Sequence, residues 1–393
     1  MRNLNLAIAC VMLICANNVF AQTNEQQMPE YEEAIKAFDN KDYAKAHEWW
    51  AKAVEKGNSA AMNRLGMLYG NGLGVAQDYV KAREWLTKAA EKGNTAAMTN
   101  LGYLHQNGLG VAQDYAKAHE WLTKAADNGD ATAMNNLGYF YKNGGLGVVQ
   151  DYAKAHEWLT KAADNESANA MNLLGELYAT GLGVARDYVK AYEWYAKSAD
   201  KGNIGSMANL GYLHQNGLGV AQDYDKACEW YTKAAENGDV NAMYSLGNIY
   251  QDDIGVAQDY DKASEWYTKA AENGHAAAMN ILGTLYSKGL GVTQNYAKAY
   301  EWYAKAAEKG NDAAMVNLGY LYADALGIAR DYSKTHEWWT KAAEKGNATA
   351  MYLLGVLYEN GLGVARDYAK SREWYVKAAE NGNIHAKEEM DRR

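Results

Sequence analysis

Residues 61–94 have the sequence AMNRLGMLYGNGLGVAQDYVKAREWLTKAAEKGN, and this stretch recurs along the whole chain. Successive copies are 36 residues apart, except for one interval of 37 in which Gly145 follows Gly144 as an extra residue. Repetition at this period is typical of a solenoid whose supersecondary units pack on their neighbours. The methionine near the start of each copy stands at Met62, Met98, Met134, Met171, Met207, Met243, Met279, Met315 and Met351.

We number positions in a repeat from this methionine, which is position 0. Small or apolar residues recur at positions 0, 3, 4 and 7, the stripe of an amphipathic helix. This helix, called helix A, is expected between Asn58, which suits an N-cap, and Gly72, which permits a positive φ. The residues equivalent to Asn58 include Asn94, Asp130, Asn203, Asp239 and Asn311.

A second helix, called helix B, is expected between the N-cap Asp78 and Gly93. Its inner face consists of Tyr79, Ala82, Trp85, Leu86 and Ala89. A glycine such as Gly66 at position 4 costs roughly 1 kcal/mol relative to alanine in a helix interior. We therefore expect helix B to approach helix A closely at this glycine. The pattern predicts an all-α fold, a right-handed α-solenoid of helix–loop–helix units.

The two ends of the chain depart from the repeat. Residues 1–21 combine Arg2, a short apolar run and a small-residue cleavage site, which is typical of a removed secretory signal peptide. A short linker is expected at 22–30 and a degenerate capping repeat at 31–61. Nine full repeats then occupy 62–383, and 384–393 form a polar C-terminal cap.

The string LGxLYxNGLGVAQDYxKAxEWxxKAAEKGN closely resembles the Sel1-like repeat, a relative of the tetratricopeptide repeat, over residues 31–385. The resemblance implies an adaptor that gathers other proteins, in bacteria often in the periplasm or at the cell surface. Three residues depart from the pattern: Glu166 replaces the glycine that closes helix B, and Asp253 and Ala325 replace the first loop glycine. These positions should be slightly distorted.

Charge and cysteine content narrow the classes of partner. The formal net charge is −9, and removing Arg2 with the signal peptide makes it −10, which argues against nucleic acid or an anionic membrane as partner. Cys228 alone would remain in the mature chain, so we expect no internal disulfide. No membrane span and no cofactor are expected.

Positions 1, 5 and 8 vary between repeats and lie on one face of helix A. In tetratricopeptide arrays the equivalent helix lines the concave surface, and by that analogy this face is the expected binding groove. Tyr and Asn dominate it, which suits an extended peptide; the alternative is that any exposed face varies. The candidate partner-binding residues are Tyr103, Gln106, Asn135, Tyr139, Lys142, Tyr212, Gln215, Tyr244, Asn248, Tyr320 and Tyr352.

Two repeated residue types could indicate other functions. Ten of the twelve tryptophans occupy one helix-B position, which favours core packing over carbohydrate stacking; Trp50 and Trp339 fall outside this register. The four histidines His47, His119, His156 and His336 share another helix-B position. That position also holds Arg, Tyr, Cys and Ser, so we interpret it as a tolerant exposed site rather than a metal site.

The sequence therefore predicts an exported, non-enzymatic scaffold, in the periplasm or secreted to the cell surface or medium, that binds a protein or peptide on helix A. One alternative is a cell-envelope factor that contacts peptidoglycan or assists a wall enzyme. A cryptic hydrolase that uses Cys228, or His119 with His156, is a further alternative, but no base is evident for the thiol. The near-identical repeats leave self-association open.

Overall fold

The structure is a computed structural model that describes residues 28–144, 147–253 and 255–391, and within these ranges every regular element is an α-helix. The all-α prediction is confirmed. The expected signal peptide and the extra Gly145 lie outside the described residues.

Nine helices A carry the repeat methionines. Their bounds are α4 (Ser59–Asn71), α6 (Thr95–Asn107), α8 (Ala131–Asn143), α10 (Ala168–Thr180), α12 (Ile204–Asn216), α14 (Val240–Gln251), α16 (Ala276–Lys288), α18 (Asp312–Ala323) and α20 (Ala348–Asn360).

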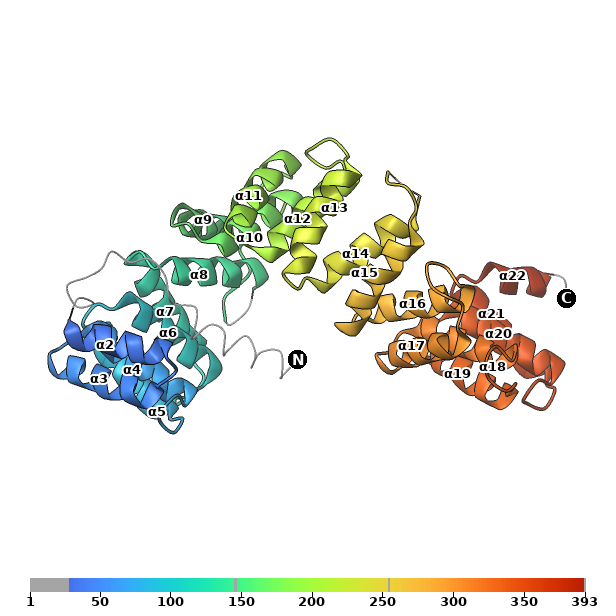
Figure 1. The fold of residues 1–393 in the computed structure, drawn as a ribbon, viewed down its shortest axis with the longest axis horizontal. Coiled ribbons are helices and arrows are strands. Elements are labelled where there is room, and N and C mark those ends of the chain that lie inside the picture. The colour runs from blue at the N-terminus through green and yellow to red at the C-terminus, as the bar shows by residue number, and fades with distance from the viewer. Residues whose placement is uncertain (1–27, 145–146, 254, 392–393) are drawn as a thin grey trace. The chain divides into compact units, whose positions relative to one another are not determined.

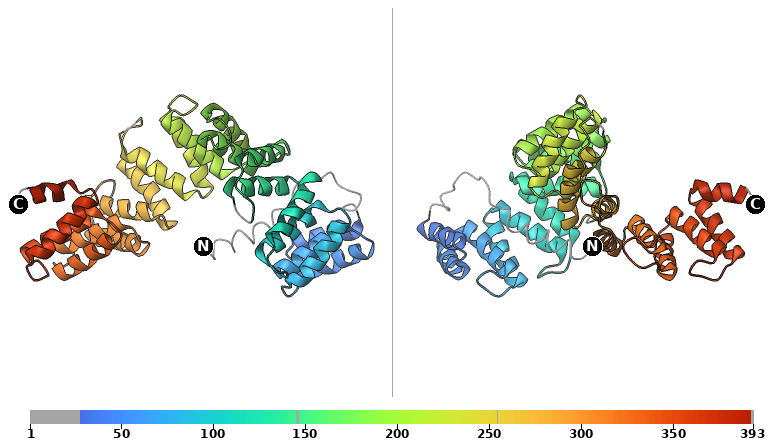
Figure 2. Two further views of the ribbon diagram at one scale, coloured as in Figure 1. Left: turned by 180° about the vertical axis from the view of Figure 1, so that it is seen from behind. Right: turned by 45° about the vertical axis from the view of Figure 1, so that its right-hand side comes forward.

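Each helix A is followed by a helix B. The bounds of these helices are α5 (Tyr79–Glu91), α7 (Tyr115–Asp127), α9 (Tyr152–Asp164), α11 (Tyr188–Asp200), α13 (Tyr224–Glu236), α15 (Tyr260–Glu272), α17 (Tyr296–Glu308), α19 (Tyr332–Glu344) and α21 (Tyr368–Glu380). The hairpin of α2 (Pro29–Asp39) and α3 (Tyr43–Glu55) precedes them, and α22 (Ile384–Asp391) follows. Figures 1 and 2 show helices that are consecutive in sequence, such as α4 with α5 and α20 with α21, lying side by side.

The chain divides into two compact units whose boundary falls within α12. Unit 1 comprises residues 1–206 and unit 2 comprises residues 207–393. In each unit, helices of one repeat also pack on the helices of the next, as α5 does on α6 and α15 on α16. This is the nearest-neighbour packing that defines a solenoid.

The predicted caps set the helix ends. The Asn58 side chain accepts a hydrogen bond from the Ala61 backbone N–H at 2.7 Å. The equivalents Asn94, Asp130, Asn203, Asp239 and Asn311 each accept from the residue three positions later. Asp78 caps α5 in the same way, and α4 ends at Gly72 with φ +66°. These contacts satisfy backbone groups that a helix end leaves unpaired.

The glycine at position 4 marks the closest approach of the two helices in a repeat. A Cβ atom on Gly66 would lie 2.7 Å from the Leu86 Cγ atom, which confirms the predicted packing. Leu65, Leu86 and Ala89 are buried beside it. Tyr79 and Trp85 from the predicted inner face are only half-buried. The core is therefore a layer between helix A and helix B that continues from repeat to repeat.

The three predicted distortions have visible backbone consequences. Glu166 and Ala325 adopt positive φ angles of +64° and +57°, a region that favours glycine. Helix α18, before Ala325, and helix α14, before Asp253, have 12 residues, whereas the other helices A have 13. The backbone is therefore strained at Glu166 and Ala325, whereas the effect at Asp253 is the shorter helix before it.

We expect Ala325→Gly to raise the free energy of unfolding by about 1 kcal/mol, because glycine relieves the left-handed backbone there. The same change at Ala304, inside α17, should lower it by about 1 kcal/mol, the ordinary cost of glycine in a helix. Urea unfolding of both variants measures the two effects. If both substitutions changed the free energy of unfolding in the same direction, the result would contradict backbone strain at Ala325.

Candidate functional site: the helix-A face

The helix-A face comprises positions 1, 5 and 8 of each helix A. Its tyrosines differ in exposure: Tyr139 and Tyr212 are 50% and 53% exposed and Tyr320 is 37% exposed. Tyr103, Tyr244 and Tyr352 are half-buried, as are Gln106, Asn135, Lys142, Gln215 and Asn248. All the candidate residues thus lie on helices A, and the most exposed ones are tyrosines at position 5.

Position 1 is less accessible than the sequence pattern implies. Asn63, Thr99 and Val316 are buried. The Asn63 side chain accepts a hydrogen bond from Asn100 of the next repeat at 3.0 Å. This position therefore helps to join successive helices A.

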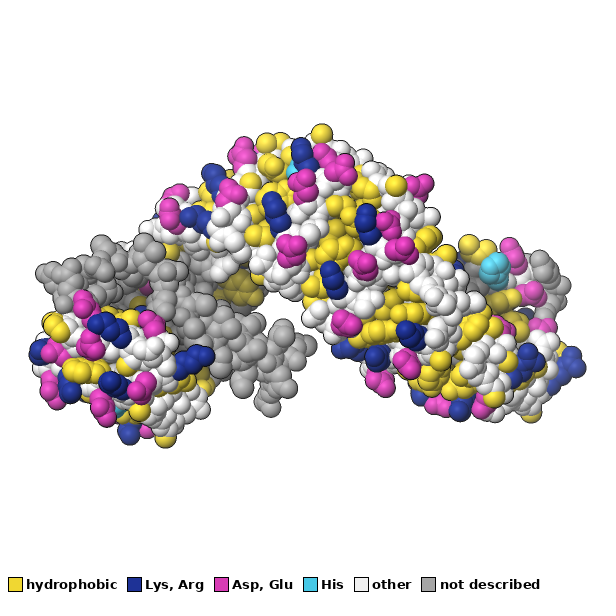
Figure 3. Space-filling model, in the orientation of Figure 1, with side chains coloured by type: hydrophobic (Ala, Val, Ile, Leu, Met, Phe, Trp, Pro, Cys, Tyr) yellow, Lys and Arg dark blue, Asp and Glu magenta, His cyan; other side chains and the backbone are white. Residues whose placement is uncertain are grey.

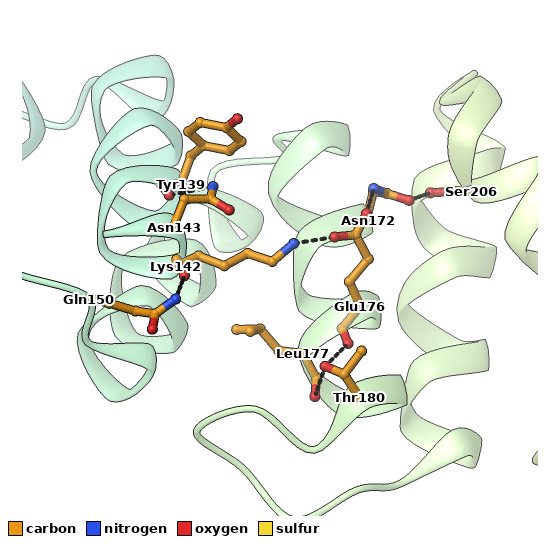
Figure 4. A network of polar contacts seen from close by, with 9 residues as sticks. All are labelled: Tyr139, Lys142, Asn143, Gln150, Asn172, Glu176, Leu177, Thr180 and Ser206. Carbon is orange, nitrogen blue, oxygen red and sulfur yellow. Dashed lines mark hydrogen bonds and ion pairs between the residues drawn. The ribbon is translucent and has the colours of Figure 1, made fainter. Parts of the chain in front are cut away.

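A polar network connects α8, α10 and the first turn of α12 (Figure 4). Lys142 extends from α8 to form an ion pair with Glu176 on α10. Asn172 donates to Glu176 at 2.9 Å and accepts from the Ser206 hydroxyl at 2.8 Å. Lys142, Glu176 and Asn172 occupy positions 8, 5 and 1 of their helices A, and the structure brings them together. Because Glu176 neutralises Lys142, this part of the face carries no net charge.

Helix B supplies a second layer behind the face in unit 2. The Tyr231 hydroxyl donates to Gln215 Oε1 at 2.9 Å. The Tyr267 hydroxyl donates to Asn248 Oδ1 at 2.7 Å and lies 3.3 Å from Gln251 Oε1. These tyrosines are 4% and 0% exposed, so they act from inside the core on side chains of the face.

The residue at this helix-B position, which directly follows the repeated tryptophan, differs between the two ends of the array. It is Leu86, Leu122 and Leu159 in the first three repeats. In the later repeats it is Tyr195, Tyr231, Tyr267, Tyr303, Trp339 and Tyr375. These residues were not among the predicted site residues, although the change from leucine to tyrosine is visible in the sequence.

Aromatic contacts fix several tyrosines of the face. Tyr244 stacks on His275 with ring centroids 4.4 Å apart. Tyr320 meets Trp339 edge to face at 5.5 Å, and Tyr352 packs on Tyr375 at the same separation. These rings lose little conformational freedom on binding a partner, because their positions are already set.

The shared histidine position is not a tolerant exposed site, and that interpretation is corrected here. His47, His119, His156 and His336 are half-buried. Each Nε2 atom lies 3.0–3.2 Å from a tyrosine hydroxyl of the next repeat; the partners are Tyr69, Tyr141, Tyr178 and Tyr358. Burial lowers the pKa of all four histidines. The position forms part of the joint between repeats.

The ten tryptophans in register are half-buried at the edge of the core, whereas Trp50 and Trp339 are the deeply buried ones. Over each half-buried ring lies the ammonium group of the lysine three residues later, 4.0 to 4.8 Å from the ring centroid. A sugar would have to displace these lysines in order to stack on the rings. The arrangement favours packing, as the sequence predicted.

The described residues offer little for catalysis. Burial raises the pKa of the Cys228 thiol, which keeps it protonated and a weak nucleophile. No group of three or more His, Cys, Asp or Glu residues in the described ranges is arranged to hold a metal ion. Figure 3 shows positive and negative side chains interspersed on the visible surface, with no basic patch.

Comparison with known proteins places this fold in a family. The chain is similar to a protective antigen present in uropathogenic Escherichia coli strains, with 33% identity and a TM-score of 0.62 over 91% of this chain and 87% of that one. It is also similar to a Sel1 repeat protein from Oxalobacter formigenes, with 36% identity and a TM-score of 0.58 over 62% of this chain and 99% of that one. The comparison with curated proteins found no match.

A family model described as the Sel1 repeat matches ten consecutive segments, and the matched residues are 39–58, 59–94, 95–130, 131–167, 168–203, 204–239, 240–275, 276–311, 312–347 and 348–383. Together with the helical hairpins and the glycine-dependent packing, this match shows that the chain belongs to the Sel1 repeat family.

Proposed function

We propose that this protein is a non-enzymatic scaffold that binds a protein segment along its helix-A face. Sel1 repeats generally mediate protein interactions. The observation that carries the proposal is the contrast within each repeat. The packing positions are nearly uniform, whereas the face varies and exposes Tyr139, Tyr212 and Tyr320.

Tyrosine suits such a surface because it offers a large apolar ring with a polar tip at a low cost in conformational entropy. Alternation of these rings with amide side chains such as Asn135 and Asn248 fits an extended chain, whose backbone groups are unpaired. The ion pair of Lys142 with Glu176 adds no net charge. The face is therefore suited to a neutral segment.

We also propose that the protein is exported to the periplasm, the cell surface or the medium. The order of charge, apolar run and small residues in 1–21 supports export. Among the described residues, none of the helices has the length and apolar content needed to cross a bilayer.

We expect simultaneous replacement of Tyr103, Tyr139 and Tyr212 by alanine to weaken capture of the partner at least about tenfold, because truncation removes the main contact area. Helicity should be unchanged, since these side chains lie outside the deeply buried core. Affinity capture from the native compartment with quantitative mass spectrometry measures the effect.

The matched control replaces three exposed helix-B residues by alanine. These are Val80, Val189 and Tyr368, whose side chains are 47%, 53% and 55% exposed. This variant should capture the partner as the unchanged protein does. If the helix-A variant captured the partner as well as the unchanged protein does, the result would contradict binding at the helix-A face.

A further inference from the structure

Unit 2 contains two side-chain amides whose orientation is fixed by hydrogen bonds from the core. Gln215 and Asn248 each receive a hydrogen bond from a buried tyrosine hydroxyl on helix B, at 2.9 Å from Tyr231 and 2.7 Å from Tyr267. Both amides belong to the helix-A face, and both hydroxyls belong to the core. Which partner donates in these hydrogen bonds decides which amide atoms point away from the core.

The hydroxyls act as donors. Burial raises the pKa of Tyr231 to about 12 and also raises that of Tyr267, so both keep their proton. An amide oxygen can only accept, so the Tyr231 hydroxyl is the donor in its bond to Gln215. The single Tyr231 proton is then directed to the Gln215 oxygen.

An amide whose oxygen accepts from the core presents its NH₂ group on the other side. Each NH₂ carries two donor protons. No hydrogen bond occupies the amide nitrogens of Gln215 and Asn248 among the described residues. The helix-A face of unit 2 therefore offers oriented donors rather than freely rotating amides.

We propose that Tyr231 and Tyr267 are positioning residues, and that the amide donors of Gln215 and Asn248 bind backbone carbonyl oxygens of an extended peptide. This inference rests on the proposed function and specifies how unit 2 recognises its partner. Neither tyrosine touches the peptide. Each holds an amide in the one orientation that donates.

Charge selects the carbonyl oxygen over a charged acceptor. Positions 1, 5 and 8 of unit 2 contain no Lys, Arg or His. The single charged side chain there is Glu359, whose carboxylate accepts from the Tyr375 hydroxyl at 2.7 Å. A carboxylate or phosphate ligand would meet no cation at this face and would be repelled by Glu359 and by the net charge of −9.

The surroundings suit a peptide chain. Tyr212 and Tyr320 are both exposed, both stand at position 5 of their helices A, and both offer apolar contact area. Tyr244, one turn before Asn248, is held by its stack on His275. Extended peptides leave carbonyl groups free, and the two donors on the successive helices α12 and α14 can each bind one.

Unit 1 provides a natural contrast. The first three repeats of unit 1 have Leu86, Leu122 and Leu159 in place of the tyrosine, so no hydroxyl reaches the face from helix B there, whereas the fourth has Tyr195. Its polar side chains instead bond to one another, as Lys142 does with Glu176 and Asn100 with Asn63. Removing hydroxyl groups from unit 2 should therefore affect recognition by unit 2 alone.

The test uses the full chain and a displayed library of random peptides as the probe. Peptides selected by the unchanged protein are synthesised, and their affinity is measured by fluorescence anisotropy. The double variant Tyr231→Phe/Tyr267→Phe, which retains both rings, should bind about tenfold more weakly. The side-chain NH₂ signals of Gln215 and Asn248 in nitrogen-15 spectra should shift in this variant.

The matched control is Tyr224→Phe/Tyr260→Phe. These hydroxyls lie at the start of helix B and accept from the Gln222 and Gln258 side chains at 3.2 Å. The same two side chains donate to the backbone carbonyls of Gln215 and Gln251 rather than to the side-chain amides under test. The control removes the same number of hydroxyl groups and should bind as the unchanged protein does. Thermal unfolding of both variants verifies that they are folded at the temperature of the assay.

An ester in place of one peptide bond weakens the carbonyl as an acceptor. An ester scan along a selected peptide should find linkages whose replacement weakens binding to the unchanged protein and has a smaller effect on Tyr231→Phe/Tyr267→Phe. This loss of additivity is expected only if the tyrosines act through the amides.

The outcomes separate this inference from the proposed function. Unchanged binding by Tyr231→Phe/Tyr267→Phe overturns the positioning role. If replacement of Tyr103, Tyr139 and Tyr212 by alanine still abolishes binding in that case, the helix-A face is retained as the binding surface. Equal weakening by the control pair also overturns the positioning role. Failure of the unchanged protein to select any peptide overturns both proposals.

Discussion

Replacing Gly319 by alanine is expected to lower the free energy of unfolding by about 3 kcal/mol. A Cβ atom there would lie 2.0 Å from Trp339 Nε1, far inside the contact distance. The ring is 4% exposed and donates from Nε1 to the Val316 carbonyl at 3.1 Å. Moving it would break this hydrogen bond and leave a buried N–H unpaired, which outweighs the gain of about 1 kcal/mol in helix propensity.

A second substitution, at Trp339, should relieve this clash. Trp339→Leu introduces the side chain found at Leu86, which is smaller and more flexible than the indole ring, and should reduce the overlap with the Cβ atom of Ala at position 319. Although this change alone should destabilise the protein through a cavity, the double variant should be more stable than the sum of the two single effects predicts. Additive effects in urea unfolding would show that Gly319 is not required for the approach of Trp339.

Gly70→Ala is the matched control, because Gly70 also lies inside helix A. A Cβ atom there would lie 3.7 Å from the Ala82 Cβ, an ordinary contact. This change should stabilise the protein by up to about 1 kcal/mol. Opposite signs at Gly319 and Gly70 would separate close helix packing from the general effect of glycine in a helix.

Acidification is expected to destabilise the joints between repeats. His47, His119, His156 and His336 have folded pKa values below their ordinary value of 6.5, chiefly because of burial. The unfolded chain therefore binds more protons than the folded chain as the pH falls through 6.5. The stabilisation is fully present above this pH and is lost progressively down to the folded pKa values.

The geometry explains why the charged form is disfavoured. A half-buried imidazolium is poorly solvated, and this burial is the largest cause of the lowered pKa of each of these histidines. The ammonium of Lys154 also lies over the ring of Tyr141, the partner of His119, and lowers the pKa of that histidine. Repulsion from this lysine adds to the cost of charging the buried ring.

Thermal unfolding measures this effect. The melting temperature should fall by several degrees between about pH 7.5 and about pH 5.5, and the fall should be smaller when all four histidines are replaced by glutamine. His385→Gln is the control, since His385 is exposed and outside these joints. A pH dependence that persists unchanged in the fourfold variant would contradict the role of the histidines.

Local features of the fold could be predicted from the sequence because they depend on nearby residues. Asn58 and Gly72 are separated by one helix, and their roles follow from backbone chemistry. The distorted joint at Ala325 was predicted for the same reason. Comparison of nine copies also showed which positions pack and which vary, so the helix-A face could be listed residue by residue.

Contacts between repeats could not be predicted in this way. The ion pair of Lys142 with Glu176 and the bond of His119 with Tyr141 depend on the register of neighbouring helices. A variable position such as that of His119 looks tolerant in a single repeat, although its partner lies in the next one. The direction of the Tyr231 hydroxyl likewise depends on how deeply helix B packs.

Site-specific photocrosslinking tests the central claim most directly. A photoreactive phenylalanine analogue replaces Tyr139 or Tyr212 on the helix-A face, or Tyr368 on helix B, where the native side chains have similar exposed fractions. In the native compartment, the first two positions should crosslink to one protein species that Tyr368 does not capture. Equal capture at all three positions, or capture only at Tyr368, would contradict binding along helix A.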